Sequence, residues 1–375
     1  MNNGHRKKIV IASILKPVGD PRLFEKFAQT LAKSGKYNIF IVGYEGSYMN
    51  IYPNIRFKPL FKFYRISLSR VFAPFKFFMY VLKVYPELII IQTHELIWAA
   101  VLFKKLTGAK LIYDIQENYY LNHFYSNSYL LPIKYFNALY IRLKELLTWE
   151  SFNHIIFAEK CYVDEMKFIK KNFTVIENKF KQQKVLESKR SNKNLDAKRI
   201  LFSGTLSKYS GVYHAIELVR KLHHRDPSYY LVIVGYAPES SVRKRIKYIT
   251  KRKKYIKLIW DDQPVNHLEI LREIEKSDFG LIAYEPNKIS KDRIPTKLFE
   301  YIGMQLPIIC WKNENWDAYL QKYNAGISID YKNINADQLI EDLNKSEFYN
   351  IQYSKEEVLW ESEENKLLEI VKNLI

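Results

Sequence analysis

Short apolar runs alternate with longer amphipathic stretches along most of the chain. The apolar runs have the length and residue types of strands, whereas the stretches between them repeat apolar positions at helical spacing. In the first half, strands are predicted at residues 8–15, 38–42, 88–92, 110–113, 154–158 and 174–177. Amphipathic segments such as 22–33 and 97–106 separate them. This alternation predicts a doubly wound α/β fold with a parallel sheet.

The pattern is interrupted once. Residues 181–199 are highly polar and have little apolar surface to bury, which is typical of an interdomain linker. Strand patterns resume at residues 199–202, 229–234, 256–260, 279–283, 307–310 and 326–329. No short repeat is visible, which disfavours a solenoid. We therefore expect two α/β domains, at residues 1–185 and 198–352.

Composition agrees with a two-domain protein of the cytoplasm. A chain of 375 residues is long for one core, and a hydrophobic content of 47% excludes general disorder. Cys161 and Cys310 are the only cysteines and lie in or beside apolar runs, so neither a disulfide framework nor a cysteine metal site is expected. The apolar run at residues 9–15 is too short for a signal peptide, and no run is long enough to span a bilayer.

A formal net charge of +19 calls for an anionic partner. The basic residues are spread along the chain without zinc-finger spacing or an RNA-recognition signature, so nucleic acid is not favoured. Residues 61–83 interleave aromatic side chains with Lys62, Arg65, Arg70, Lys76 and Lys83. This mixture predicts peripheral contact with an anionic membrane, on the inner face of the plasma membrane. Alternatively, the aromatic side chains pack into the first domain and the cations are solvated.

Residues 294–310 carry the most informative pattern. Pro295 suits the first turn of a helix, and Lys297 and Glu300 lie three apart on one helical face. The free N–H groups of a helix start at Thr296 attract anions. Together these groups suit a nucleotide diphosphate. An ordinary amphipathic helix before a buried strand, with a Lys–Glu surface ion pair, is the alternative.

The loop after the first predicted strand contains Gly19, Asp20 and Arg22. Ligands of open parallel sheets bind at the carboxyl ends of strands. Gly19 lets the backbone approach a ligand, and Arg22 offers a fixed charge. A plain turn in which Asp20 and Pro21 start a helix is the alternative.

Titratable side chains follow two further strands. His94 and Glu95 come after the run at 88–92, and Asp114, Gln116 and Glu117 come after the run at 110–113. Side chains at neighbouring strand ends can face one cleft and share acid–base work. A single histidine at a strand end also serves often as a structural hydrogen-bonding group.

In the second half, the pattern of residues 201–211 predicts a strand, a turn at Gly204 and the start of a helix that continues over residues 212–222. Backbone N–H groups at such a helix start can hold phosphate oxygens. The segment therefore predicts a second contact to the same anion as Lys297.

These segments together resemble glycosyltransferase family 4 and its relatives, enzymes with the two-domain GT-B fold. Residues 295–301 are similar to its Pro-x-Lys-x-x-Glu-Tyr signature, and residues 20–22, 94–95 and 113–117 to motifs of its first domain. Residues 201–211 are similar to its Gly-Arg-Leu-x-x-x-Lys-Gly segment. The resemblance implies two Rossmann-like domains, with a C-terminal helix at 353–375 that packs back on the first domain.

The resemblance also assigns roles to individual residues. It implies catalytic roles for His94, Glu117 and Asp292, and acceptor binding by Asp20, Arg22 and Gln116. For the donor nucleotide sugar it implies Gly19, Gly204, Thr205, Lys208, Tyr284, Thr296, Lys297, Leu298 and Glu300.

Three positions depart from the family pattern. Thr205 and Ser210 stand where an Arg and a Lys usually grip the pyrophosphate, so neutralisation of the diphosphate falls to Lys208 and Lys297. Gln116 stands where the family often has His, and Gln cannot transfer a proton, although it can bind a sugar hydroxyl.

The function implied by the resemblance is transfer of a sugar from a UDP- or GDP-sugar to a hydroxyl of a glycan or lipid-linked acceptor, in bacterial surface polysaccharide assembly. Retention of configuration is implied, and neither a metal nor another cofactor is expected, since no Asp-x-Asp motif occurs. Two other functions stay open. One is a sugar-nucleotide epimerase, and the other is a basic nucleic-acid- or glycan-binding protein of the same fold without transfer activity.

Overall fold

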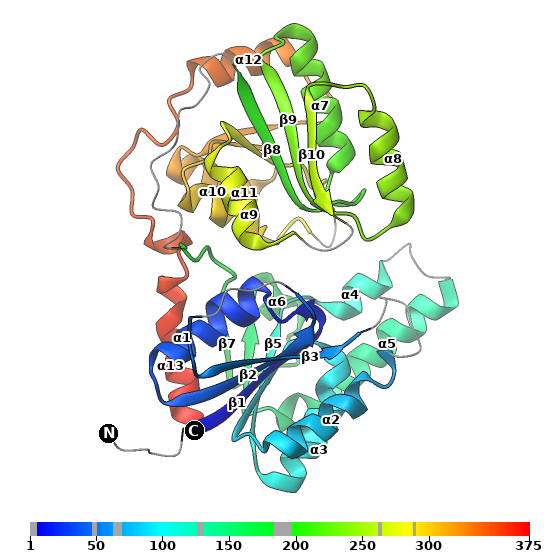
Figure 1. Ribbon diagram of the computed structural model, residues 1–375, viewed down its shortest axis with the longest axis vertical. Helices are drawn as coiled ribbons and strands as arrows, with labels where there is room; N and C mark the ends of the chain where they lie inside the picture. The colour runs from blue at the N-terminus through cyan, green and yellow to red at the C-terminus, as the bar shows by residue number, and fades with distance from the viewer. Residues whose placement is uncertain are drawn as a thin grey trace. The chain divides into compact units, whose positions relative to one another are not determined.

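The computed structural model describes residues 6–46, 51–62, 70–125, 131–183, 197–261, 265–287 and 290–375. The chain forms two compact units, whose elements are labelled in Figure 1. The first unit consists of Met1–Asn178 and Trp360–Ile375, and the second of Lys179–Leu359. Most of the segment 181–199, interpreted above as a linker, lies outside the described residues.

A seven-stranded parallel sheet, in the order β3-β2-β1-β4-β5-β6-β7, forms the centre of the first unit. Its strands are β1 (Lys7–Pro17), β2 (Tyr37–Tyr44), β3 (Ile55–Phe61), β4 (Leu88–Ile91), β5 (Lys110–Ile115), β6 (His154–Phe157) and β7 (Phe173–Val175). The strand order reverses between β1 and β4, and a reversal of this kind marks the usual ligand edge of an open α/β sheet.

Helices cover both faces of the first sheet because its strands are apolar on both sides. In β1, Ile9 and Ile11 pack under the helices η1, α1 and α13, whereas Val10 and Ala12 pack under α2 and α3. The helices of this unit are η1 (Pro21–Ala28), α1 (Gln29–Lys33), α2 (Ala73–Val84), η3 (His94–Leu96), α3 (Ile97–Thr107), α4 (Tyr119–Phe124), α5 (Leu131–Thr148), η4 (Trp149–Ser151), α6 (Cys161–Glu165) and α13 (Glu361–Leu374).

The second unit repeats the plan with a six-stranded parallel sheet in the order β10-β9-β8-β11-β12-β13. Its strands are β8 (Lys198–Thr205), β9 (Tyr229–Tyr236), β10 (Ile256–Asp261), β11 (Phe279–Ile282), β12 (Ile308–Trp311) and β13 (Gly326–Ile329). Its helices are α7 (Val212–Arg225), α8 (Ser240–Thr250), α9 (His267–Glu275), α10 (Thr296–Gly303), α11 (Glu314–Tyr323), α12 (Ala336–Lys345) and η6 (Glu356–Val358). The order reverses between β8 and β11, so the loops after these two strands lie at the expected ligand edge.

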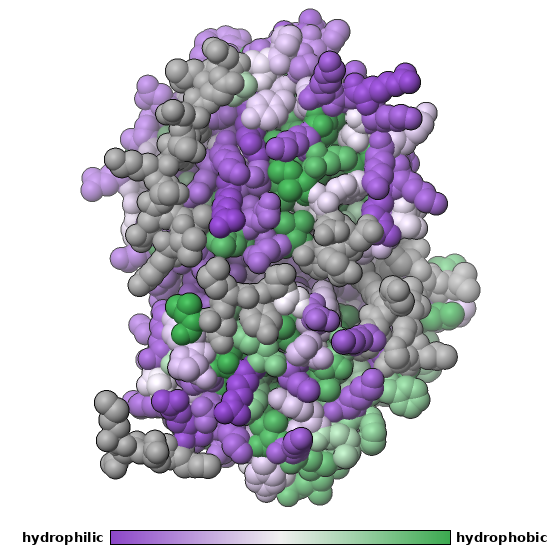
Figure 2. Space-filling model, viewed as in Figure 1, coloured by the Kyte–Doolittle hydropathy of each residue, from purple (hydrophilic) through white to green (hydrophobic). Residues whose placement is uncertain are grey.

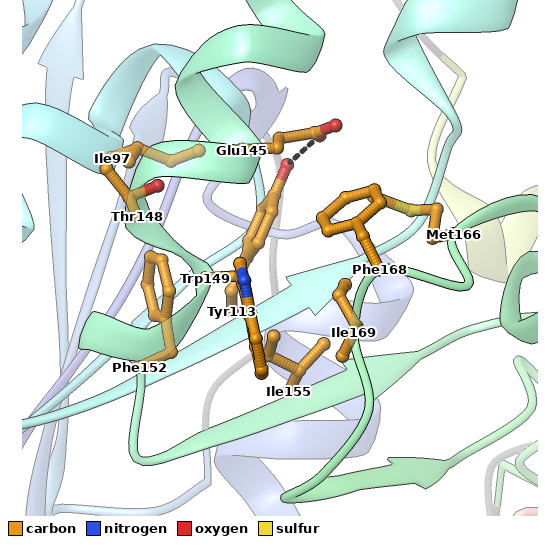
Figure 3. Close-up of a pocket in the computed structure, with 10 residues that line it drawn as sticks. All are labelled: Ile97, Tyr113, Glu145, Thr148, Trp149, Phe152, Ile155, Met166, Phe168 and Ile169. Carbon is orange, nitrogen blue, oxygen red and sulfur yellow. Dashed lines mark hydrogen bonds between the residues drawn. The ribbon is translucent and has the colours of Figure 1, made fainter.

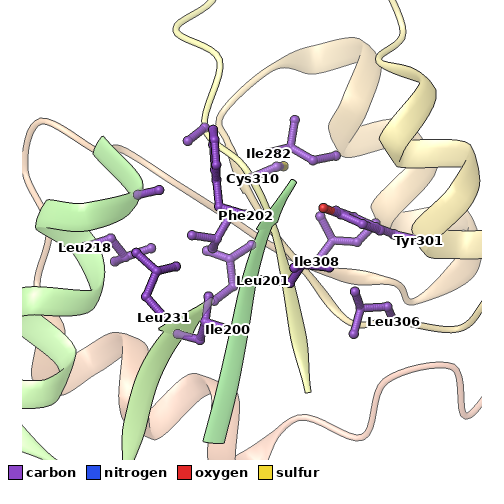
Figure 4. Packing of buried hydrophobic residues seen from close by; sticks show 14 of the residues in the cluster. Ile200, Leu201, Phe202, Leu218, Leu231, Ile282, Tyr301, Leu306, Ile308 and Cys310 are labelled. Atoms are coloured by element: carbon purple, nitrogen blue, oxygen red, sulfur yellow. The ribbon is translucent and has the colours of Figure 1, made fainter. Parts of the chain in front are cut away.

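Figure 4 shows part of the core of the second unit, where side chains of β8, β11 and β12 meet those of α7 and α10. Leu201 and Phe202 of β8 are fully buried there, and so is Cys310 of β12. Burial raises the pKa of the Cys310 thiol. This cysteine is therefore a core residue and an unreactive thiol.

The end of the chain returns to the first unit. Trp360 is fully buried against Phe27, and its indole Nε1 donates a hydrogen bond to Thr30 Oγ1 at 2.9 Å. α13 then packs on the face formed by η1 and α1. Residues 353–359 belong to the second unit, so the returning segment begins later than position 353.

The sequence pattern located nearly every strand to within a few residues. β3 was missed. Its sequence, Ile-Arg-Phe-Lys-Pro-Leu-Phe, mixes exposed and covered positions without strict alternation. It also contains Pro59, which is tolerated because β3 is an edge strand. Within the described parts of the chain, no helix is both long and apolar enough to cross a membrane.

Candidate functional site

Helix α10 places two charged side chains inside the second unit. Pro295 is the N-cap residue with extended backbone angles, so the helix begins at Thr296 without a side-chain cap. Lys297 and Glu300 have exposed fractions of only 8% and 9%. The surface ion pair considered above is therefore wrong, because a solvated pair needs both side chains in water.

The ammonium group of Lys297 is buried among aromatic rings. Its Nζ lies 4.9 Å from the ring centre of Phe202 and 5.1 Å from that of Tyr284. A Cβ built on Gly204 would lie 3.4 Å from this Nζ, so the lysine lies against the end of β8. Among the residues that the structure describes, Nζ has no hydrogen-bond acceptor. A buried cation in this state is costly, and an anionic ligand would compensate it.

Glu300 is held by a histidine that the sequence analysis missed. Its Oε1 lies 3.0 Å from Nε2 of His267, the first residue of α9. His267 follows Asn266, whose side chain caps α9, and this Asn-His pair at a helix start was the available signal. This contact fixes the position of the Glu300 carboxylate, which belongs to the same helix as Lys297.

The loop after β8 is closed by its own serines. Ser207 N donates to Ser210 Oγ at 2.9 Å, and that hydroxyl donates to Ser207 O at 2.9 Å. Ser210, at the position of the family's usual Lys, is thus a loop-closing residue. Gly204 has a left-handed φ of 97°, and side chains at Thr205 and Lys208 are exposed. Lys208 therefore does not turn inward beside Lys297.

The remaining predicted donor residues differ in their access. Tyr284 follows β11 and presents its ring to Lys297. Thr296 is half-buried at the start of α10. Leu298 is fully buried in the core and its N–H donates to Pro295 O at 2.8 Å, so it has no group to offer a donor. Asp292 is exposed in the preceding loop, where its Oδ2 lies 3.9 Å from Lys291 Nζ.

In the first unit, Arg22 serves as a clamp. Its Nε and one terminal nitrogen donate to the two carboxylate oxygens of Asp114 at 2.8 and 2.6 Å, and that nitrogen also donates to Ile176 O at 3.0 Å. Arg22 and Asp114 are both buried. The charge expected to bind an acceptor is therefore paired with Asp114 inside the protein, and acceptor binding by Arg22 stays a prediction.

Asp20 and Gly19 form the turn that leads to this clamp. Asp20 N donates to Pro17 O at 2.9 Å, and Asp20 Oδ1 accepts from the backbone N–H groups of Arg22 and Leu23. The interpretation as a turn that starts a helix is therefore correct, and Asp20 is a capping residue. Gly19 is half-buried in this turn.

His94 lies in a buried cluster with Lys144 and Glu95. Its Nδ1 is 2.9 Å from Lys144 Nζ, and its Nε2 is 3.5 Å from Glu95 Oε1. An ammonium only donates, so Nδ1 must accept and Nε2 carries the hydrogen. Burial lowers the pKa of His94 to about 3, against the opposing effect of Glu95. Both ring nitrogens are thus engaged, which leaves none for a catalytic proton transfer in this arrangement.

Gln116 and Glu117 follow β5 but have different partners. Gln116 Nε2 donates to Asp114 Oδ2 at 3.3 Å, and Gln92 Nε2 donates to the same oxygen at 2.8 Å. Glu117 Oε2 accepts from Asn122 of α4 at 2.9 Å. The edge at β1, β4 and β5 therefore gathers Arg22, Gln92 and Gln116 around Asp114, whereas Glu117 stands apart from them.

Figure 3 shows a cavity beside α5 in the first unit. Its volume is about 10 Å³, and its polar lining residues include Glu145 and Tyr113, which are joined by a hydrogen bond of 3.3 Å. Burial raises the pKa of Glu145 to about 7. Ligand pockets usually have about 300–1,000 Å³, and none of the predicted site residues lines this cavity, so it is a packing defect.

Within the described ranges, no three His, Cys, Asp or Glu side chains come together in a way that could hold a metal ion.

Most of the second unit matches a known protein family. Residues 183–348 match the family model described as glycosyl transferases group 1. This segment belongs to the glycosyl transferases group 1 family. It contains the loop at Gly204 and helix α10 with Lys297 and Glu300. A search of curated proteins found no match for the chain.

Solved structures show that the whole chain has the GT-B fold of glycosyltransferases. The sucrose-phosphate synthase of Thermosynechococcus elongatus is 12% identical, with a TM-score of 0.71 over 98% of this chain and 99% of that one. Anabaena HepE in complex with UDP and glucose is 13% identical, with a TM-score of 0.65 over 98% and 100%. A putative UDP-N-acetylglucosamine 2-epimerase from Listeria monocytogenes is 12% identical, with a TM-score of 0.56 over 98% and 96%.

In this glycosyltransferase group 1 segment, the two charged side chains of α10, Lys297 and Glu300, are the strongest candidates for ligand contact. Both are nearly buried, both lie on one helix, and that helix begins at the carboxyl edge of the sheet. The arrangement can bind an anion at Lys297 and accept hydrogen bonds from vicinal hydroxyls at Glu300.

Proposed function

We propose that the protein transfers a sugar from a nucleotide diphosphate sugar to an acceptor hydroxyl. The observation that carries this proposal is the ammonium group of Lys297, which is buried between Phe202 and Tyr284 with no acceptor among the described residues. A diphosphate would supply the missing negative charge. Membership of residues 183–348 in a glycosyltransferase family supports a sugar nucleotide as the carrier of that diphosphate.

Such a donor has two parts, and each has a candidate contact in the second unit. The diphosphate would lie between Lys297, the uncapped start of α10 and the turn at Gly204, where N–H groups and the ammonium neutralise charge that grows on the leaving group. The ribose hydroxyls would donate to Glu300, which His267 holds in place. Transition-state stabilisation would come mainly from this fixed positive charge.

The finer points of the proposal rest on the family resemblance. We expect transfer of a hexose from a UDP- or GDP-sugar with retention of configuration, to a glycan or a lipid-linked acceptor of bacterial surface polysaccharide. No metal or other cofactor is proposed, because a lysine and helix N-termini can neutralise a diphosphate and the chain has no Asp-x-Asp motif. Asp292, Glu117, Thr205 and Gln116 stay predicted contacts.

Thermal unfolding with UDP, GDP, ADP and their common sugars tests the donor site. A ligand that binds only the native state raises the free energy of unfolding, by about 2.7 kcal/mol at a hundred times its Kd. We expect a shift with one nucleotide in the wild type and its loss in Glu300→Ala. Glu217→Gln on α7 removes an exposed acid paired with Arg220 and serves as the matched control. No shift with any nucleotide would contradict the proposal.

Epimerisation of a sugar nucleotide is the second candidate, because one of the similar structures is described as a putative 2-epimerase. An epimerase would convert a UDP-sugar to its isomer without releasing UDP. A transferase releases the nucleotide when an acceptor is present. Product analysis by proton NMR distinguishes the two reactions, and binding without either reaction would favour a glycan- or nucleic-acid-binding protein.

A further inference from the structure

Large hydrophobic side chains are exposed mainly on three helices of the first unit. On α2 and α3, Phe75, Met79, Trp98, Leu102 and Leu106 repeat every four residues, so each helix carries an exposed apolar stripe. On α5 the exposed set is Leu131, Ile133, Tyr135, Phe136, Leu139, Tyr140, Leu143, Leu146 and Leu147. A soluble protein rarely exposes so many large apolar side chains in one region without a binding function.

Helix α5 shows an inverted distribution of polarity. Its inner side includes Lys134, Lys144 and Glu145, which are buried, while Phe136 and Leu147 have exposed fractions of 72% and 67%. An ordinary surface helix buries its apolar side. The exposed side of α5 is therefore as apolar as a helix side that is normally covered by other apolar groups.

The three helices belong to one surface, which we call the α2–α3–α5 face. α2 and α3 pack side by side on the same face of the sheet. Lys144 of α5 contacts His94 of η3, the short helix that directly precedes α3. Ile97 of α3 lines the same cavity as Glu145 of α5. Figure 2 shows hydrophobic side chains gathered at the end of the first unit where Figure 1 places these helices.

The charges on this face are positive. Lys76 and Lys83 of α2 and Lys105 of α3 are exposed. Neither helix contains an acidic residue, and the single acid of α5, Glu145, is buried. The apolar side chains are thus accompanied by cations without exposed acids on the same helices.

We propose that the α2–α3–α5 face binds the surface of an anionic lipid bilayer. Aromatic and aliphatic side chains enter the boundary between headgroups and acyl chains, and the lysines meet the phosphates. The binding is peripheral, because no helix within the described residues can span a membrane. The proposal goes beyond sugar transfer and does not depend on it.

Charge argues against a second copy of the chain as the partner. In a two-fold symmetric dimer the same patch meets itself, so Lys76, Lys83 and Lys105 would face a patch that carries the same positive charges. Like charges across an interface disfavour association. Anionic headgroups complement the same lysines, which is why a bilayer fits the face better.

This face also refines the expectation that residues 61–83 bind a membrane. Residues 63–69 of that segment lie outside the described residues. Phe77 is fully buried in the core and Phe78 packs partly against it, while Phe75 and Met79 are exposed. Only one side of α2 is therefore available, and α3 and α5 supply the larger part of the surface.

Flotation with vesicles of phosphatidylcholine, alone or mixed with phosphatidylglycerol, tests the proposal on the full chain. We expect the wild type to float with the anionic vesicles. The triple variant Phe136→Gln, Leu139→Gln and Leu143→Gln should bind at least about tenfold more weakly, because it removes apolar insertion. Lys76→Gln and Lys83→Gln should each weaken binding about fivefold.

A matched control removes exposed hydrophobic side chains elsewhere. Tyr209→Gln, Tyr248→Gln and Ile351→Gln lie in the second unit and should leave flotation unchanged. Acyl chains that carry bromine should quench Trp98, and the difference between wild type and Trp98→Phe isolates that signal. Because all these side chains are exposed, unchanged circular dichroism should accompany the variants.

Several results would overturn the proposal. The wild type could stay in the soluble fraction with both vesicle types, or the triple variant could float as well as the control. Sedimentation velocity could instead show a dimer that the triple variant dissociates, which would assign the face to a second copy. Equal binding to neutral and anionic vesicles would refute the role of the lysines.

Discussion

Replacing Lys297 by methionine should weaken nucleotide binding and, at the same time, stabilise the empty protein. Methionine keeps an unbranched apolar side chain of similar length next to Phe202 and Tyr284, and it removes only the charge. The prediction follows from the burial of Nζ without an acceptor among the described residues. A lysine kept for packing alone would give the opposite result for stability.

The two effects have different magnitudes. A charge-assisted contact to a diphosphate contributes about 1.5–3 kcal/mol, which corresponds to a Kd about ten- to a hundredfold higher in the variant. Burial of an uncompensated ammonium costs several kcal/mol, and two cation–π contacts near 5 Å return about 1–2 kcal/mol each. We therefore expect the free energy of unfolding to rise by about 1–3 kcal/mol.

Isothermal titration with the nucleotide found by thermal shift measures the first effect, and urea unfolding without ligand measures the second. Lys208→Met, at an exposed lysine in the loop after β8, is the matched control and should change the stability by less than about 0.5 kcal/mol. A less stable Lys297→Met protein with unchanged affinity would refute the reasoning, because the lysine would then be structural.

Further measurements test the first unit. Arg22→Met should lower the free energy of unfolding by about 3–5 kcal/mol because it leaves the buried Asp114 carboxylate without its main partner, and adding Asp114→Asn should recover much of that loss in urea unfolding. Burial raises the pKa of Glu145 to about 7, so its ionisation destabilises the fold as pH rises from the unfolded value near 4.5 through 7. Glu145→Gln should thus stabilise the protein by up to about 3 kcal/mol at about pH 8 and leave it unchanged at about pH 4. A thiol reagent should label half-buried Cys161 in the native protein, and Cys310 only after unfolding, as mass spectrometry of the labelled peptides would show.

Sequence patterns predicted the strands well where burial on both faces leaves a continuous apolar run. β4, with Leu88 followed by three isoleucines, is such a strand. The edge strand β3 is half-exposed and contains Pro59, so its pattern is weak. The sequence of α5 does not reveal that its large apolar residues are exposed. Periodicity shows that a helix has two different sides, but it does not show which side packs against the rest of the protein.

The site could be predicted only in part, because the hydrogen-bond partners of its charged side chains lie far away in the sequence. The positions of Lys297 and Glu300 on one helix follow from their spacing. The partner of Arg22 lies 92 residues away in the chain, so no local pattern reveals that its charge is neutralised by Asp114. His267 approaches Glu300 from another helix for the same reason.

Buried charged side chains of the first unit are paired with one another, whereas Lys297 of the second unit is not paired with any described residue. This difference is why we propose that the diphosphate binds to the second unit. In the first unit, Arg22 is paired with Asp114, and His94 is enclosed between Lys144 and Glu95, so these groups hold the edge of the sheet together. In the second unit, Lys297 is also buried but has no such partner among the described residues. A buried charge without a partner lowers the stability of the protein. A diphosphate that binds next to Lys297 in each turnover would neutralise this charge while it is bound, and would thereby stabilise the protein.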